Sequence, residues 1–390
     1  MERGFFANLL LFLLASLPII FIGFIGVVFT GLMGLVKFYT PLVIVITAGI
    51  LFILCNGFFK FLKGRPLKLA VISFLSLCLA AIVIYEGINA YHNSFETLDD
   101  SEVDLYQYQP FTENSKAVSL DEKSTLKLDE PLPQLDGATA LYPVYSAFVQ
   151  ATYPEKEYDL YDQSESDVLV TKTPNAYQNL INGKVDIIFA AGPSERQLAH
   201  AEQKGVELEL TPIGREAFVF FVNAENPVEG LTIEEIQNIY AGNTTNWSEV
   251  GGEDDEIRAF QRPDDSGSQT ALENVMGDIP LMEPPKEDVV AGMGGIIEQT
   301  SNYRNYPNAI GYSFRYFSMD MVQNDAIKHL KINGVAPTKE TIRNGDYPMS
   351  SEFYAITAGS GNQNIEPFIE WILSEQGQKI IEKTGYVSLK

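Results

Sequence analysis

The 390-residue chain has only two cysteines and three histidines. Both cysteines, Cys55 and Cys78, lie within long apolar stretches, so the polar remainder of the chain contains none. This absence excludes a disulfide framework, a thiol nucleophile and a cysteine-ligated metal site from that part. The histidines (His92, His200 and His329) are far apart in the sequence, which argues against a zinc site. We therefore predict no metal and no other cofactor.

Basic residues are scarce after residue 95. The chain has 27 basic and 51 acidic residues, of which six and two respectively precede residue 96, so 21 basic and 49 acidic residues remain. Such a charge balance repels nucleic acid and anionic lipid headgroups, because its field opposes their charge. We predict no nucleic-acid partner.

Charged residues are nearly absent from the first 95 positions. Uncharged stretches cover residues 4–36, 38–59 and 69–85. A helix needs about 20 apolar residues to cross the hydrocarbon core of a membrane. The first stretch is too long for the apolar region of a signal peptide, and no small-residue cleavage site ends it. The sequence predicts three transmembrane helices, the first of them kinked or tilted at Pro18.

The basic residues of this segment indicate its orientation. Lys60, Lys63, Arg65 and Lys68 cluster between the second and third stretches, which favours a cytoplasmic loop, although Lys37 opposes this assignment. Three crossings then place the N-terminus inside the cell and everything after about residue 91 outside. We predict a multi-pass protein of the cell membrane with an extracellular C-terminal domain.

Composition divides the chain into three parts. Residues 1–92 form the membrane segment, and residues 93–133 are polar, acidic and weakly periodic, which is typical of a linker or stalk. The linker contains a few apolar residues that can order it in part. Residues 134–390 form a soluble domain, and their number exceeds what one α/β unit needs, so we expect two lobes.

The soluble domain alternates short β-type stretches with helical periodicity. Helices are expected at 144–152, 175–182, about 194–204 and 232–240, and strands at 167–170, 186–190 and 217–222. Thr232 with Glu235 three residues later forms a capping-box pattern before the last of these helices. The alternation predicts an α/β fold with mostly parallel strands.

Three helix starts in this domain carry residues suited to binding an anion. Unpaired N–H groups and the helix dipole favour negative charge at such positions, and hydroxyls or a forked guanidinium add donors. Their spacing leaves open whether the three starts meet, and a Ser or Thr there is commonly a plain cap. The segments begin at Asp136, at Thr173 as the expected N-cap, and at Arg262.

Several longer motifs resemble the phosphate-binding subunits of phosphate ABC transporters. They are the Arg-x-Asp-x-Ser-Gly-Ser turn beginning at Arg262, LTIEEIQNIYAGNTTNWSEVGG (231–252), NAIGYSF (308–314) and FIEWILSEQGQKIIEKTGYVSL (368–389). The resemblance covers about residues 135–389 and leaves the membrane segment unexplained.

This resemblance implies a two-lobed, type II periplasmic-binding-protein fold that closes over phosphate. Lobe 1 would comprise about 134–215 and 312–390, and lobe 2 about 216–311, with hinges near 214–217 and 310–312. The phosphate ligands carried over from the family are Thr139, Ala140, Thr173, Arg262, Asp264, Ser266, Gly267 and Ser268.

Two positions depart from the family pattern. Phosphate binders often carry an aspartate that accepts the proton of hydrogen phosphate, and here the aligned residue is Ala191. Asp265 stands where a glycine is usual. The sequence allows Asp265 to be either a solvated helix cap or a replacement acceptor, and it leaves phosphate and other tetrahedral oxyanions as alternatives.

The predicted function is therefore a membrane-anchored binding protein that takes up phosphate together with ABC permease subunits. A sensor with the same fold is an alternative, because three helices exceed what tethering needs. A phosphoester-acting enzyme is a weaker alternative, since the sequence has no Walker-type loop, no metal cluster and no catalytic serine–histidine pattern. We predict no enzymatic activity and no catalytic residues.

Overall fold

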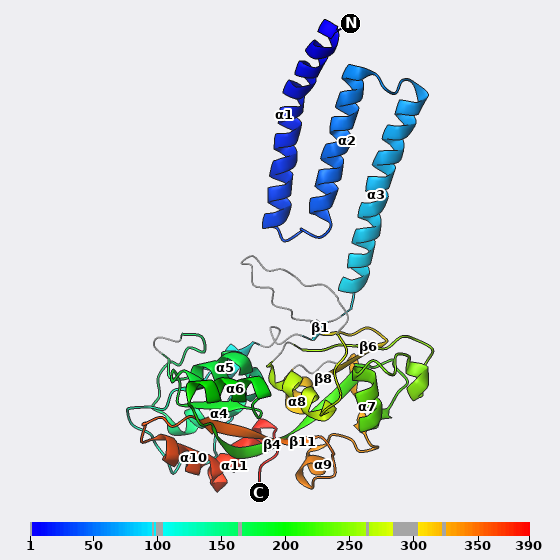
Figure 1. Cartoon of the computed structure of the whole chain (residues 1–390). Helices are drawn as coiled ribbons and strands as arrows, with labels where there is room; N and C mark the ends of the chain where they lie inside the picture. The colour runs from blue at the N-terminus through cyan, green and yellow to red at the C-terminus, as the bar shows by residue number, and fades with distance from the viewer. Residues whose placement is uncertain are drawn as a thin grey trace. The chain divides into compact units, whose positions relative to one another are not determined.

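A computed structural model describes residues 2–95, 97–98, 104–162, 166–262, 265–283, 303–321 and 325–390 (Figure 1). The described chain falls into two units, one formed by the N-terminal helices and the other by the chain from Thr97 onward. Each unit has its own internal packing.

The N-terminal unit consists of three long helices: α1 (Glu2–Leu32), α2 (Tyr39–Phe59) and α3 (Arg65–Asn93). All three are long and apolar enough to cross a membrane, which agrees with the prediction from the sequence. Pro18 lies within α1. Helices α1 and α2 approach closely, because a Cβ atom added at Gly23 would lie 2.5 Å from the Thr47 hydroxyl. Small residues at such contacts let helices pack in lipid, where the hydrophobic effect does not drive association.

The second unit mixes helices and strands. Its strands are β1 (Thr97–Leu98), β2 (Leu135–Gly137), β3 (Ile187–Ala190), β4 (Glu209–Asn223), β5 (Gly230–Leu231), β6 (Arg258–Ala259), β7 (Tyr303–Arg304), β8 (Ala309–Phe314), β9 (Ile327–His329), β10 (Lys331–Ile332) and β11 (Ser350–Thr357). Its α-helices are α4 (Tyr142–Thr152), α5 (Lys172–Ile181), α6 (Glu195–Lys204), α7 (Ile233–Tyr240), α8 (Gly267–Met276), α9 (Lys339–Arg343), α10 (Ile365–Leu373) and α11 (Glu375–Thr384). Short turns of 3-10 or π helix occur at 105–108, 139–141, 247–250 and 317–321.

Seven of these strands form a mixed sheet, ordered β2-β3-β11-β4-β8-β6, with β9 also paired to β4, while β1 pairs with β7 and β5 with β10. The expectation of mostly parallel strands is wrong for the described strands, because β11 and β4 run antiparallel to their neighbours. The expected strand at 167–170 is reduced to one bridge between Leu135 and Val168. The other expected helices and strands are present, and the capping box of Thr232 and Glu235 opens α7 as predicted.

Two hydrophobic regions lie along this sheet, and they define two lobes. The first lobe is built around Phe148, Phe189 and Trp371, with a smaller cluster around Tyr177 on α5. The second lobe is built around Phe220, Trp247 and Leu272. The two tryptophans of the chain thus lie one in each lobe.

Strand β4 connects the lobes. Its residues up to Ala217 pair with β11, and from Phe218 onward they pair with β8. The chain also passes between lobes after β8, because Tyr316 packs in the first core. Residues 310–312 lie inside β8, where that strand pairs with β4 in the second lobe, so this crossing follows β8 instead of interrupting it.

The chain between residues 327 and 349 packs in the second lobe. Leu330, Ile332, Ile342 and Tyr347 are buried in the second core. The division predicted from the sequence assigns residues 312–390 to lobe 1, whereas residues 327–349 pack in the second lobe. The physical reason is pairing: β9 joins β4 and β10 joins β5, which draws this segment back to the second lobe.

The segment predicted as a linker packs on the first lobe from residue 104 onward. Leu105, Leu128 and Leu132 are buried in the first core. Gln109 also donates a hydrogen bond of 2.8 Å to the carbonyl of Tyr158. Widely spaced apolar residues give no clear period, which is why the sequence alone resembles a linker here.

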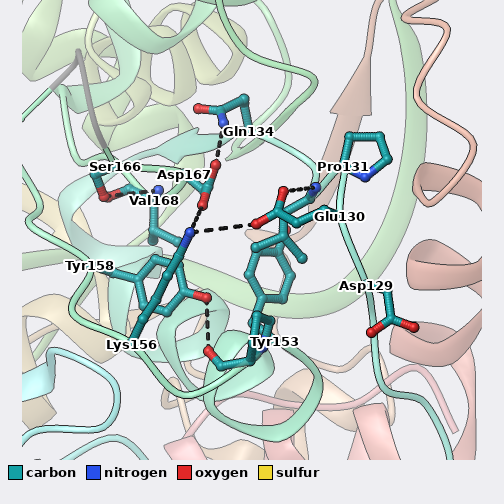
Figure 2. A network of polar contacts seen from close by, with 12 residues as sticks. Asp129, Glu130, Pro131, Gln134, Tyr153, Lys156, Tyr158, Ser166, Asp167 and Val168 are labelled. Atoms are coloured by element: carbon teal, nitrogen blue, oxygen red, sulfur yellow. Dashed lines mark hydrogen bonds and ion pairs between the residues drawn. The ribbon is translucent and has the colours of Figure 1, made fainter.

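A polar network anchors residues 130–134, at the end of this segment, to the loop after α4 (Figure 2). The Lys156 ammonium lies 2.7 Å from the Asp167 carboxylate and 3.8 Å from Glu130. Gln134 donates to the same Asp167 carboxylate. The network joins residues 130–134 to the loop after α4, directly before β2 leads to the predicted site.

Glu216 lies beside the point where β4 changes partners. Its side chain is almost fully buried and accepts hydrogen bonds from the backbone N–H groups of Ala217 and Tyr316, at 2.8 and 3.1 Å. Burial raises the pKa of Glu216 from 4.5 to about 7, and the hydrogen bonds from Ala217 and Tyr316, with the charge of Arg315, only partly offset this. One carboxyl group therefore links both crossings of the chain.

This raised pKa predicts a pH-dependent cost to folding. Well below pH 4.5 the Glu216 carboxyl is protonated in both the folded and the unfolded chain. Between pH 4.5 and 7 this carboxyl ionises first in the unfolded chain, so the folded state loses stability as the pH rises. Glu216→Gln cannot ionise, but it loses one acceptor. We expect the variant to be less stable than the wild type at pH 5, and this deficit to shrink by about 2–3 kcal/mol at pH 8. Denaturant titrations followed by tryptophan fluorescence would measure both values, and a deficit independent of pH would contradict the prediction.

Candidate functional site

The first predicted helix start follows β2. Thr139 and Ala140 lie in a 3-10 turn that leads into α4, with Pro143 in the first turn of that helix. Thr139 is buried, and the carbonyl of Ala140 accepts a hydrogen bond of 2.6 Å from the Tyr386 hydroxyl. The C-terminal segment of the chain thus holds this turn in place.

Asp136 joins the first helix start to the second. Its carboxylate is fully buried and accepts hydrogen bonds from the N–H and hydroxyl of Thr171, at 2.9 and 2.6 Å. The side-chain amide of Asn179 donates to it at 2.9 Å, and the N–H of Gly137 at 2.8 Å. Desolvation raises the pKa of Asp136, and these donors partly counteract that rise. One side chain therefore holds the end of β2 against the start of α5.

The start of α5 differs by two residues from the expectation. The helix begins at Lys172, so Thr171 occupies the N-cap position and Thr173 lies in the first turn. Thr171 does not cap the helix with its side chain, because its hydroxyl donates to Asp136 instead. Thr173 is buried and its hydroxyl is left facing the third helix start.

The third helix start meets the second. A Cβ atom added at Gly267 would lie 3.5 Å from the Thr173 hydroxyl and 3.7 Å from the Cβ atom of Ala191. Gly267 belongs to the second lobe and the other two residues to the first, so the lobes touch here. Helices α5 and α8 therefore bring their N-terminal turns together, as the binding prediction requires.

Ser266 and Ser268 occupy the first positions of α8. Ser266 is the N-cap residue, and its hydroxyl accepts a hydrogen bond of 3.2 Å from the N–H of Gln269. Ser268 is in the first turn. Asp264 lies outside the described residues, and its predicted role stays a prediction.

Arg262 precedes this turn and is held by its backbone. Its N–H donates to the Tyr312 hydroxyl at 2.8 Å and to the Gln269 side chain at 3.0 Å. Tyr312 is buried in β8 and also donates to Gln269. Strand β8 and the first turn of α8 thus fix the position of Arg262. Its role as an anion ligand, like those of Thr139, Ala140, Thr173, Ser266, Gly267 and Ser268, stays a prediction.

Asp265 has a different environment from both sequence-based alternatives. Its carboxylate oxygens lie 2.8 Å from the Ser194 hydroxyl and 3.0 Å from an Arg196 nitrogen. Ser194 and Arg196 belong to the start of α6, which sequence reasoning predicted as a helix but did not connect with the site. Only the capping-box spacing of Ser194 and Gln197 was available as a signal, and it reports a helix start alone.

A serine–histidine contact occurs within the described part of the chain, and sequence spacing did not reveal it. The Ser318 hydroxyl lies 2.8 Å from His329 Nε2, and burial lowers the pKa of His329 to about 4. Ser318 is only 3% exposed, so a substrate cannot reach its hydroxyl. Among the residues that the structure describes, no group of three or more His, Cys, Asp or Glu side chains is arranged to hold a metal ion.

Comparisons with known proteins agree with the resemblance predicted from the sequence. The phosphate-binding protein PstS of Borreliella burgdorferi is 24% identical over 271 residues, covering 67% of this chain and 91% of that protein. PstS of Bacillus subtilis is 29% identical over 196 residues, covering 48% of this chain and 60% of that protein. Both relatives are named as phosphate-binding proteins.

Solved structures and a family model complete the comparison. A putative phosphate ABC transporter substrate-binding protein from Clostridium perfringens, solved with bound phosphate, is 25% identical with a TM-score of 0.47, covering 66% of this chain and 98% of that one. The family model described as the PBP superfamily domain matches residues 132–376, well over half of the chain. This protein therefore belongs to the PBP superfamily.

Proposed function

We propose that this protein is a membrane-anchored, extracytoplasmic receptor that binds phosphate, or a similar tetrahedral oxyanion, for uptake by an ABC permease. The observation that carries the proposal is the approach of Gly267 to Thr173, which places two helix N-termini from different lobes side by side. Backbone N–H groups at such ends hold phosphate without a countercharge. The names of the PstS relatives support phosphate as the anion.

The remaining proposed ligands lie on segments that lead to these two helix starts. Asp136 holds the end of β2, which is followed by Thr139 and Ala140, against the start of α5, and Arg262 precedes the start of α8. A guanidinium adds a full positive charge and forked donors, which suits a multiply charged anion. The strongly acidic soluble part does not prevent binding, because exposed charges are screened by salt beyond about 10 Å.

The membrane helices support the proposed location. The basic loop between α2 and α3 favours the cytoplasmic side, which leaves the soluble domain outside the cell. The same three helices also fit the sensor alternative, because they offer a surface for binding partners other than a permease. Co-purification from membranes distinguishes the two: permease subunits indicate uptake, and a kinase or cell-wall enzymes indicate sensing.

The proposal excludes enzymatic turnover. The serine–histidine pair is inaccessible, and the described residues of the proposed site contribute N–H, hydroxyl and guanidinium donors.

Calorimetry on the full chain in nanodiscs tests the proposed function. We expect a dissociation constant for phosphate that is micromolar or tighter, since closed anion sites of this kind use many short hydrogen bonds. Sulfate, arsenate and molybdate serve as competitors of the same shape. Binding of phosphate by the wild type supports the proposal, and an absence of heat with every one of these anions would refute it.

A further inference from the structure

Asp265 makes polar contacts from the turn before α8 to the start of α6. Its two carboxylate oxygens contact Ser194 and Arg196, and its own carbonyl accepts a hydrogen bond of 3.3 Å from the Gln197 side chain. Asp265 has a φ of 61°, in the left-handed region. Aspartate adopts this conformation more readily than most residues, but still at some cost. Both the backbone and the side chain of Asp265 are thus committed to this contact.

The contact joins the two lobes. Helix α6 follows β3 and packs against α5, in the first lobe. Helix α8 contributes Leu272 and Met276 to the second core. Any opening of the lobes around the Gly267–Thr173 approach must therefore also separate Asp265 from Ser194 and Arg196.

The start of α6 is a favourable place for a carboxylate. Ser194 is the N-cap residue of this ten-residue helix, and the helix dipole stabilises negative charge there. The Asp265 side chain is 21% exposed, whereas the Arg196 side chain is 68% exposed. Solvent therefore partly screens the ion pair of Asp265 and Arg196. The hydrogen bond of Asp265 with Ser194 is the better protected of the two interactions.

We infer that Asp265 is an interlobe latch, a positioning residue whose carboxylate docks on the first turn of α6 and slows release of the bound anion. The inference rests on the proposed function and adds a determinant of its kinetics. Both carboxylate oxygens accept from protein donors, and we assign Asp265 to this contact rather than to the proton of a bound hydrogen phosphate. This assignment replaces both roles that the sequence left open, the solvated cap and the acceptor.

Release of radiolabelled phosphate from the full chain in nanodiscs tests the latch. Asp265→Asn removes the charge while keeping a residue that tolerates a positive φ. We expect release to become about five- to tenfold faster in Asp265→Asn, with association little changed. Arg196→Gln and Ser194→Ala are expected to change release in the same direction. The double variant Asp265→Asn/Arg196→Gln should release no faster than the faster single variant, because both act on one contact.

A matched control neutralises a carboxylate within one lobe. Glu229 pairs with Lys328 at 2.9 Å, and both belong to the second lobe, so Glu229→Gln should leave the release rate unchanged. The latch is refuted if Asp265→Asn releases phosphate within twofold of the wild-type rate. It is also refuted if Asp265→Asn alone alters the ratio of phosphate to sulfate affinity, because that result would indicate a proton acceptor.

A distance measurement separates the latch from the proposed function. The soluble part has no cysteine, so spin labels at Lys204→Cys and Glu234→Cys can report the lobe separation in a Cys55→Ser/Cys78→Ser background. Asp265→Asn should shift the distance distribution to longer values even without anion. If the wild type binds no anion, the proposed function fails while this shift still supports the latch. An unchanged distribution in Asp265→Asn overturns the latch.

Discussion

Arg262→Ala is expected to weaken phosphate binding by about 100-fold or more. The other described residues of the proposed site offer neutral N–H and hydroxyl donors, so Arg262 would supply a full positive charge to the anion. Removing one partner of a desolvated charge pair typically costs about 3–5 kcal/mol, because the other charge is left uncompensated. Isothermal titration of the full chain in nanodiscs would measure the loss directly.

Two further variants sharpen this test. Arg262→Lys keeps the charge but loses the forked donors, so its affinity should fall between those of the wild type and Arg262→Ala. Arg258 is a matched control four residues upstream, and its guanidinium stacks on the Tyr306 ring at 4.3 Å. Arg258→Ala should retain phosphate affinity. If Arg262→Ala binds phosphate with wild-type affinity, then Arg262 is not a ligand of the anion and the proposed site is wrong in its main residue.

Features specified by neighbouring residues could be predicted from the sequence. The three membrane helices follow from uninterrupted apolar stretches, and α7 follows from the capping box of Thr232 and Glu235. Helices α4, α5 and α6 follow from their sequence patterns to within three residues at each end. Local signals of this kind depend on side chains a few positions apart, which is the information that a sequence displays directly.

Features created by contacts distant in sequence could not be predicted in the same way. The return of residues 327–349 to the second lobe depends on pairing of β9 with a strand about a hundred residues earlier. The partners of Asp265 lie about seventy residues upstream. The sequence predicts one helix start near Asp265 and another near Ser194, and only the fold shows that these two helix starts are in contact.

The start of α5 illustrates how a tertiary contact overrides a local preference. Thr173-Pro174 is a good sequence pattern for an N-cap followed by proline, but the helix begins earlier. Thr171 and Asn179 both donate to Asp136, which lies 35 and 43 residues upstream. The buried carboxylate receives these donors in a structure where the helix starts at Lys172. Thr173 is thereby moved into the first turn, where its hydroxyl faces Gly267.

Asp136→Ala should therefore strongly destabilise the unit formed by the chain from Thr97 onward. It removes the acceptor of four hydrogen bonds in a fully buried position, two from Thr171 and one each from Asn179 and Gly137. Each buried donor left without an acceptor costs about 1–3 kcal/mol, and water entering the vacated space offsets part of the sum. We expect a loss of about 3–5 kcal/mol, measured by denaturant titration with tryptophan fluorescence.

Asp136→Asn separates the geometry of this network from its charge. Asparagine keeps one acceptor oxygen, which can serve Thr171 and Gly137, but turns an amide donor toward the Thr171 hydroxyl and Asn179. Its loss of stability should be smaller than that of alanine, while phosphate affinity should still fall, because the starts of α4 and α5 would no longer be held together. Asp159→Ala is the control: this exposed carboxylate accepts one hydrogen bond, from Tyr161 at 2.9 Å, and its removal should cost no more than about 0.5 kcal/mol. An Asp136→Ala chain as stable as Asp159→Ala would show that the two helix starts are joined by something other than this carboxylate.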